Sequence, residues 1–192
     1  MLGNKLMKVI ICLGSFLMLS SCGSDNAGGG AAEFTTVFVT AAAKTLRLES
    51  DVITGNTCTN NVTTGGTVST DTVDVDLVST KYQNVTIPAL PVRVFKATVS
   101  YAPRNSVSPA IPDQPFNVPD DILPGTTTIQ VPVVPESLKI QLVNNLNLQP
   151  CSTTVYEYYV TINFTGTEVG GSGPSRDFST NMNIAIADRS GT

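Results

Sequence analysis

Apolar and polar residues alternate one by one along much of the chain, and this period of two restricts the fold more than any other feature. Every second residue of the segment 155–164 is large and apolar, and segments 72–78 and 178–187 behave similarly. Successive side chains of a strand point to opposite faces of a sheet, so such a segment has one buried face and one solvent-exposed face. The pattern predicts strands at 34–40, 46–53, 72–78, 92–101, 127–134, 138–143, 155–164 and 178–187.

Two of these segments carry specific expectations about which side chains are buried. The phase of segment 92–101 predicts a common face made of Phe95, Ala97, Val99 and Tyr101. The phase of segment 138–143 predicts a common face made of Leu138, Ile140 and Leu142. No segment has a clear helical period, and the best helical candidate, 41–44, is too short to be stable alone.

About eight strands separated by turns predict an all-β protein, and a β-sandwich more than a barrel.

The last part of the chain resembles part of a known family. It contains Tyr-Glu-Tyr-Tyr-Val-Thr-Ile-Asn-Phe-Thr-Gly-Thr-Glu from residue 156, a Gly-Gly-Ser-Gly-Pro turn, and Asn-Ile-Ala-Ile-Ala-Asp ending at residue 188. This hairpin resembles the last hairpin of bacterial immunoglobulin-like domains. The resemblance implies an antiparallel immunoglobulin-like β-sandwich of about 7–9 strands, which we assign to residues 33–192.

The first 21 residues have the layout of a secretory signal peptide. Lys5 and Lys8 precede an apolar stretch that runs to Leu19, and small residues follow. The apolar stretch is shorter than the roughly 20 residues that a membrane-spanning helix needs. The sequence Leu19-Ser20-Ser21-Cys22 resembles the lipobox of bacterial lipoproteins.

That resemblance implies that Cys22 becomes the acylated first residue of the mature chain, bound to membrane lipid. Gly23, where an Asp commonly signals inner-membrane retention, implies the outer membrane of a Gram-negative bacterium, on its periplasmic or surface side. Residues 22–32 are rich in Gly and predict a flexible tether. Cleavage would remove two lysines and no acid, so the net charge would fall by two, from −4 to −6.

Two cysteines, Cys58 and Cys151, remain outside the signal and the lipid site. An even number of cysteines in an exported domain favours a disulfide, here between a loop and a strand end. Two free thiols are the alternative. A redox-active pair is less favoured because the Cys-x-x-Cys spacing is absent.

Composition excludes several functions. The chain has no His, which removes His-dependent catalytic triads and imidazole metal sites. Its 15 acidic residues exceed its 11 basic residues, so nucleic acid is not an expected partner. We predict no cofactor, no metal site and no catalytic residues, although Glu49, Asp51 and Glu157 are the carboxylates that a glycosidase could use.

The segment 102–125 holds six of the 12 prolines. Because proline fixes φ and lacks an N–H donor, we interpret this segment as an extended crossover between sheets. The functional alternative is a binding loop with Tyr101, Arg104 and Phe116 as contact residues.

These patterns together favour a lipid-anchored envelope protein that binds or scaffolds an envelope protein or glycan and is not an enzyme. One alternative is a carbohydrate-binding module or carbohydrate-active enzyme. Another is a structural subunit of an extracellular fibre or secretion complex, joined by strand addition. An unpaired, flat edge strand would favour this last alternative, and a charged or bulged edge would oppose it.

Overall fold

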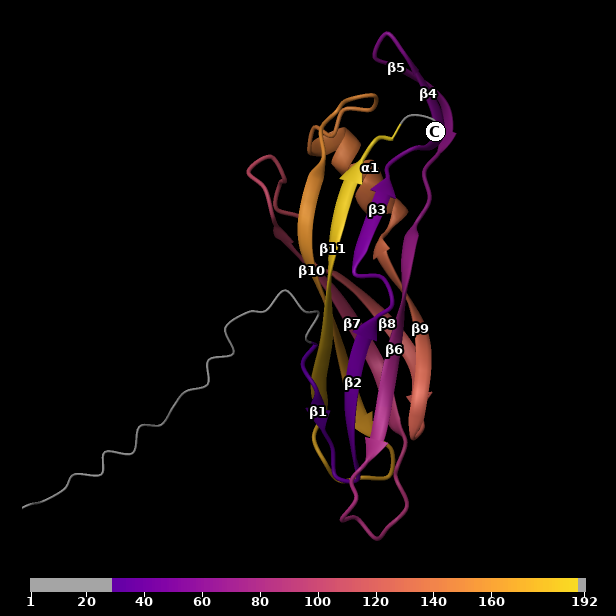
Figure 1. Cartoon of the computed structure of the whole chain (residues 1–192), viewed down its shortest axis with the longest axis vertical. Helices are drawn as coiled ribbons and strands as arrows, with labels where there is room; N and C mark the ends of the chain where they lie inside the picture. Colours follow the sequence, from indigo (N-terminus) through magenta and orange to yellow (C-terminus); the bar gives the residue numbers. More distant parts are fainter. Residues whose placement is uncertain (1–28, 190–192) are drawn as a thin grey trace, which may run out of the picture.

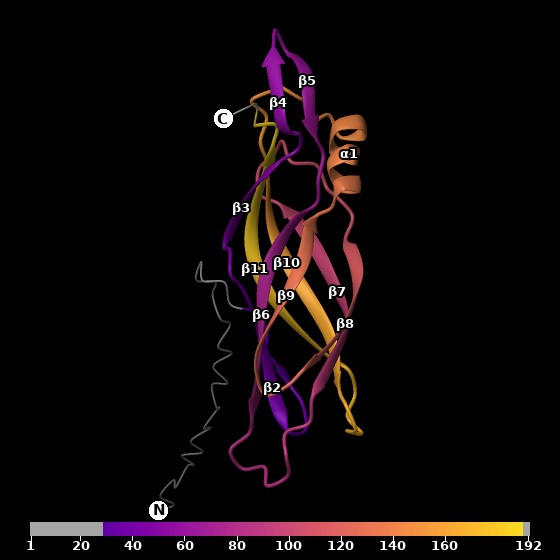
Figure 2. The ribbon, with the colours of Figure 1, turned by 90° about the vertical axis from the view of Figure 1, so that its right-hand side faces the viewer.

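The computed structural model describes residues 29–189, apart from the side chains of residues 119 and 120. The predicted signal peptide, Cys22 and the tether as far as residue 28 lie outside the described residues. The described chain folds into two facing β-sheets, with a hairpin extending beyond one end (Figures 1 and 2). The first strand begins at Ala32, the residue that the sequence assigns to the end of the tether.

The two sheets of the sandwich contain nine of the described strands. The four-stranded sheet has the order β1 (Ala32–Glu33), β2 (Val37–Ala43), β6 (Asp71–Lys81) and β9 (Gly125–Val134). The five-stranded sheet has the order β3 (Arg47–Asp51), β11 (Arg176–Ala187), β10 (Tyr156–Glu168), β7 (Val92–Pro103) and β8 (Gln114–Ile122). All the pairings are antiparallel except that of β3 with β11.

The order of the strands is that of an immunoglobulin-like sandwich, as predicted. In order across each sheet, β11-β10-β7-β8 correspond to strands G-F-C-C′, and β2-β6-β9 correspond to A-B-E. Tyr156 supplies a second feature of the fold. It begins β10, the F strand, and its hydroxyl donates to the backbone oxygen of Leu146 at 2.7 Å, which is the geometry of a tyrosine corner.

The alternating residues meet between the sheets and form one hydrophobic core. From β10 the core receives Tyr156, Tyr158, Val160, Ile162 and Phe164, and from β11 it receives Phe178, Thr180, Met182, Ile184 and Ile186. These are the faces that the sequence predicts for both strands.

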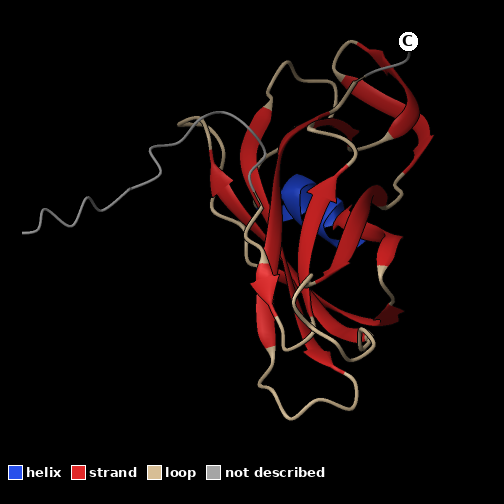
Figure 3. Cartoon of the chain, turned by 60° about the horizontal axis from the view of Figure 1, so that its bottom comes forward, coloured by secondary structure: helices blue, strands red, loops and turns tan. Residues whose placement is uncertain are grey.

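The segment predicted as a strand at 138–143 is a helix, α1 (Glu136–Asn145), drawn in blue among the strands in Figure 3. It lies at one end of the sandwich (Figure 2). Leu138 and Leu142, four residues apart, are buried, whereas Ile140 between them is 43% exposed. Residues that are four apart share a helix face, while residues two apart do not. Pro135 precedes the first turn with a φ of −60°, which suits the start of a helix. Residues 41–43 of the helical candidate at 41–44, in contrast, form the end of β2.

A bulge changes the phase of β7 and overturns the expectation for Phe95. The pairing of β7 shifts register between Val94 and Lys96 against β8. Val94 and Ala97 are both fully buried, and Phe95 is 41% exposed. One extra residue in a strand reverses the alternation beyond it, so a strict period of two assigns Phe95 to the wrong face.

Two further strand regions were not predicted. Within the proline-rich segment 102–125, residues 114–122 form the edge strand β8, where proline is tolerated because one side of the strand has no partner. β4 (Thr54–Thr59) and β5 (Val62–Thr67) form the hairpin beyond the sandwich. Asn60 and Asn61 join these two strands with φ values of 54° and 63°, as a tight hairpin turn requires.

Candidate binding surface

The three contact residues predicted for the proline-rich loop do not form one surface. Tyr101 is 7% exposed, and its hydroxyl donates to the backbone oxygen of Val133 at 2.7 Å. Burial raises the pKa of the Tyr101 phenol, so it stays neutral. Phe116 is half-buried on β8 and packs against the core. The prediction of a contact role is therefore wrong for Tyr101, which is a core residue, and Arg104 is the exposed member of the three.

Arg104 instead lies against an aromatic residue of β10, the strand that pairs with β7 in the sheet. The carbon of its guanidinium group is 4.8 Å from the centre of the Tyr159 ring, within the range of a cation–π contact. Tyr159 lies between the buried residues Tyr158 and Val160 of β10, so its side chain points to the outer face. It is 51% exposed. A large aromatic ring is thus held in a fixed position on the outer face of the five-stranded sheet.

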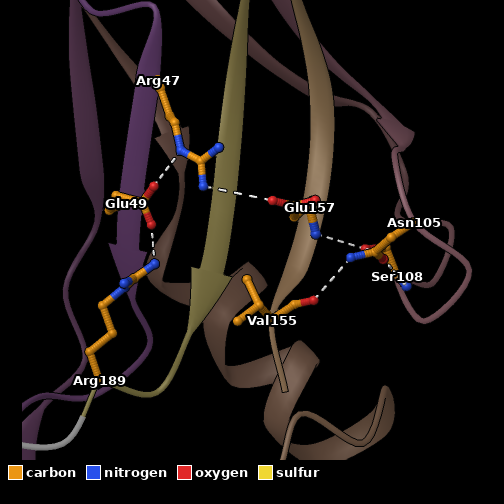
Figure 4. Close-up of polar contacts among 7 residues, drawn as sticks. All are labelled: Arg47, Glu49, Asn105, Ser108, Val155, Glu157 and Arg189. Carbon is orange, nitrogen blue, oxygen red and sulfur yellow. Dashed lines mark hydrogen bonds and ion pairs between the residues drawn. The ribbon is translucent and has the colours of Figure 1, made fainter. Parts of the chain in front are cut away.

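Charged residues on the neighbouring strands extend this surface (Figure 4). Arg47 of β3 pairs with Glu49 on its own strand and with Glu157 of β10, the latter at 3.7 Å from Nη2 to Oε1. Arg189, just after β11, pairs with the other oxygen of Glu49. The hydrogen bond that the Arg47 guanidinium donates to the Glu49 carboxylate raises the pKa of Arg47 above its usual value. Exposed ion pairs contribute little to stability, so the network mainly orients its side chains.

A set of hydrogen bonds fixes the loop that carries Arg104. The Arg104 backbone N–H donates to the backbone oxygen of Glu157 at 2.8 Å. The Glu157 N–H donates in turn to the hydroxyl of Ser108 at 2.7 Å, and the Asn105 side chain donates to the backbone oxygen of Val155 at 3.2 Å (Figure 4). The loop after β7 is therefore tied to the start of β10, where Glu157 and Tyr159 lie.

We refer to this surface as the arginine–tyrosine patch and define it as Arg47, Glu49, Arg104, Glu157, Tyr159 and Arg189. Guanidinium groups bind carboxylates and phosphates through planar pairs of donors, and Tyr and Arg are enriched among the residues that dominate binding energies. The patch can therefore recognise a polar or anionic group beside an apolar ring. Of its members, Arg104 was predicted as a contact residue, and Glu49 and Glu157 as carboxylates that a glycosidase could use. Tyr159 was not predicted, although it is a large aromatic residue on the solvent-exposed face of an alternating strand.

The structure joins Cys58 and Cys151 in a disulfide, as the cysteine count predicts. Cys58 belongs to β4, and Cys151 belongs to the turn before β10, where its φ is 63°. Asp188 is buried beside the disulfide and accepts hydrogen bonds from the Cys151 N–H and from Asn56 Nδ2, the latter at 2.9 Å. These two sulfurs and a carboxylate oxygen lie within 4.8 Å of one another, but metal coordination would require the thiolate form.

A small pocket lies at the opposite end of the sandwich from the disulfide. It measures about 220 Å³ and is lined by Glu33, Phe34, Thr35, Glu168, Gly173, Pro174 and Arg176. The Glu168 carboxylate accepts the backbone N–H of Thr36 at 2.9 Å and the backbone N–H of Thr35 at 3.2 Å. The Thr36 hydroxyl also donates to it. Because these bonds occupy its oxygens, Glu168 connects the start of β2 to the end of β10.

No family model, curated protein or solved structure matches the chain. Among the described residues, no helix combines the length and apolar content needed to cross a membrane.

Proposed function

We propose that the chain is a lipid-anchored protein of the bacterial outer membrane whose sandwich binds an envelope partner through the arginine–tyrosine patch, without catalysing a reaction. The observation that carries the proposal is the exposed Tyr159 ring with Arg104 against it, on a rigid sheet. Aromatic and arginine side chains that are fixed before binding lose little conformational entropy when a ligand contacts them.

The attachment point of the tether supports a partner near the membrane. Gly30 accepts a hydrogen bond from the Ser179 N–H of β11 at 3.0 Å. Eight residue steps separate Cys22 from Gly30, so the two lie at most about 30 Å apart. Asn183, the cross-strand neighbour of Tyr159, is four residues beyond Ser179 on the same strand, which is roughly 13 Å. The patch would therefore work close to the lipid surface.

Glycan binding is the second candidate, and the residues beside the patch favour it. Along the outer face of β10 and β11, Thr161 donates to the side chain of Asn181 at 2.8 Å, and Thr165 donates to Asp177 at 2.7 Å. Hydroxyl and amide groups next to an exposed aromatic ring suit a ligand that carries many hydroxyl groups.

A photo-reactive benzoyl-phenylalanine at position 159 of the full chain tests the patch in living cells. We expect one specific adduct from position 159 and none from position 62, because Val62 is at least as open, at 59% exposure, but lies on the β4–β5 hairpin, outside the patch. Equal adducts from both positions would refute a role for the patch.

Co-sedimentation with purified peptidoglycan sacculi tests the glycan candidate. Loss of a residue that dominates binding costs about 2 kcal/mol or more, so Tyr159→Ala should weaken retention roughly 30-fold. Val62→Ala is the matched control. If the unmodified protein does not sediment with the sacculi, glycan binding is excluded. The partner is then a protein, which the adduct from position 159 identifies.

A further inference from the structure

The sandwich has four strands at the edges of its two sheets, and three of them are protected against pairing with another chain. β1 has two residues, and three of the five residues of β3 are charged. β8 contains two prolines and two aspartates and pairs with β7 through a shifted register. Short strands, charges, prolines and bulges all oppose the addition of a further strand.

β9 has little of this protection. It is ten residues long, carries no charged residue and is rich in β-branched residues that favour strands. Within the described part of the chain β6 is its only hydrogen-bonded partner, so no strand pairs with its other side. Figure 2 looks onto this side of the molecule.

The single proline of β9 shows which backbone groups point away from β6. In an antiparallel pair, alternate residues direct both their N–H and C=O groups toward the partner strand. Pro132 has no N–H and therefore belongs to the set that points outward. The register with β6 is continuous from Gly125 to Pro132, so Thr126, Thr128 and Gln130 belong to the same outward set. Their side chains are exposed on the outer face of the sheet.

We propose that β9 is a self-association edge, where a second copy of this chain pairs antiparallel with residues 126–130. A two-fold axis at Thr128 places Thr128 opposite its own copy and Thr126 opposite Gln130. The outward N–H and C=O groups of these residues then form paired hydrogen bonds, and both copies of Pro132 remain outside the paired stretch. β9 itself is uncharged, and the ammonium group of Lys44 and the carboxylate of Asp76, which both hydrogen-bond to the Thr128 hydroxyl, pair with each other at 3.2 Å. The edge at Thr128 therefore has no net charge to oppose pairing, although the whole chain carries a net charge of −4. The pairing goes beyond the proposed function and needs no lipid.

Disulfide trapping in intact cells that express the full chain tests this register. Directly opposite residues in a hydrogen-bonded pair have Cα atoms about 5.5 Å apart, a distance that a disulfide can span. Thr128→Cys should therefore give a disulfide-linked dimer on mild oxidation. Thr161→Cys is the matched control, because Thr161 is also an exposed strand threonine with a side-chain hydrogen bond but lies in the middle of the five-stranded sheet. We expect about ten-fold more dimer from position 128 than from position 161.

A second variant separates pairing from random collision. Gln130→Pro removes one outward N–H donor from each copy. Gln130 belongs to the same outward set as Pro132, so a proline there keeps the pairing of β9 with β6. This variant should lower the amount of Thr128→Cys dimer about ten-fold. The Cys58–Cys151 bond, mapped in the monomer band, verifies that each variant is folded. Equal dimer from positions 128 and 161 overturns the proposal, and so does a cross-linked band of any other mass in place of the dimer. Because neither result depends on Tyr159 or Cys22, failure here leaves the proposed function intact.

Discussion

Glu168 is a charged residue that is buried in a network of hydrogen bonds. It is 4% exposed and accepts the three hydrogen bonds from Thr35 and Thr36 described above. Burial raises the pKa of this carboxyl group, but the hydrogen bonds from Thr36 and Thr35 outweigh burial, so the pKa lies below its usual value. Thr36 also accepts the Leu90 N–H at 2.9 Å, which extends the network to the segment before β7.

Glu168→Gln should therefore change the acid sensitivity of the protein. A carboxyl group whose pKa is lowered by folding stabilises the fold above its unfolded pKa of about 4.3, and this contribution disappears as the pH falls through the folded pKa. The variant should be less stable by roughly 1–3 kcal/mol at pH 7, and the difference should shrink below about pH 4. Urea unfolding at several pH values measures both effects. Exposed Glu33→Gln is the control, and a gap that stays constant with pH would contradict the assignment.

Among the elements, α1 shows how tertiary packing decides whether the same residues form a strand or a helix. Leu138, Ile140 and Leu142 suit a strand by their spacing of two, and Leu138 with Leu142 suits a helix by its spacing of four. The buried side chain of Lys139 adds contacts that only the helix allows. Its ammonium group donates to the backbone oxygen of Asp51 at 2.6 Å and pairs with Asp71 at 3.0 Å. These contacts hold α1 against the ends of β3 and β6.

Alanine substitutions in α1 distinguish a helix from a strand by their effects on the free energy of unfolding. Leu142→Ala should lower the free energy of unfolding by about 2–5 kcal/mol, because it leaves a cavity under a fully buried side chain. Ile140→Ala should change it by at most about 0.5 kcal/mol, because Ile140 points to solvent. Urea titration of both variants measures the contrast. Similar losses at the two positions would mean that the segment is a strand.

The whole molecule depends on one long-range covalent link. The Cys58–Cys151 disulfide closes a loop with a sequence separation of 93, which stabilises the fold by roughly 4–5 kcal/mol in the chain-entropy account. The link joins the β4–β5 hairpin to the turn before β10, and Asp188 adds the end of β11 through hydrogen bonds. Elements at one end of the sandwich are thus held together although they are distant in the sequence.

Anchoring is a property of the whole chain and is tested with a clickable fatty acid in growing cells. The unmodified chain should incorporate the label, and Cys22→Ala should lose it, because two or more acyl chains on that residue constitute the proposed anchor. Cys12→Ala, which changes a cysteine inside the predicted signal peptide, should keep the label. Equal labelling of Cys22→Ala and the unmodified chain would contradict lipid attachment at Cys22.

The alternation of residues was enough to predict the sandwich and the faces of β10 and β11, because these depend on local spacing. The number of cysteines was enough to predict a partner for Cys58. Local spacing failed at Phe95, where a bulge reverses the phase, and at Ile140, where two periods overlap. Spacing correctly placed Tyr101 on the buried face with Ala97 and Val99, and it was the separate hypothesis of a contact role that was wrong, because the Tyr101 hydroxyl donates to Val133 of the other sheet. The arginine–tyrosine patch combines residues 47 and 189 with residues 104 and 159. Only the pairing of β3 with β11, β11 with β10 and β10 with β7 brings them to one face, and strand order depends on contacts between residues that are far apart in the chain.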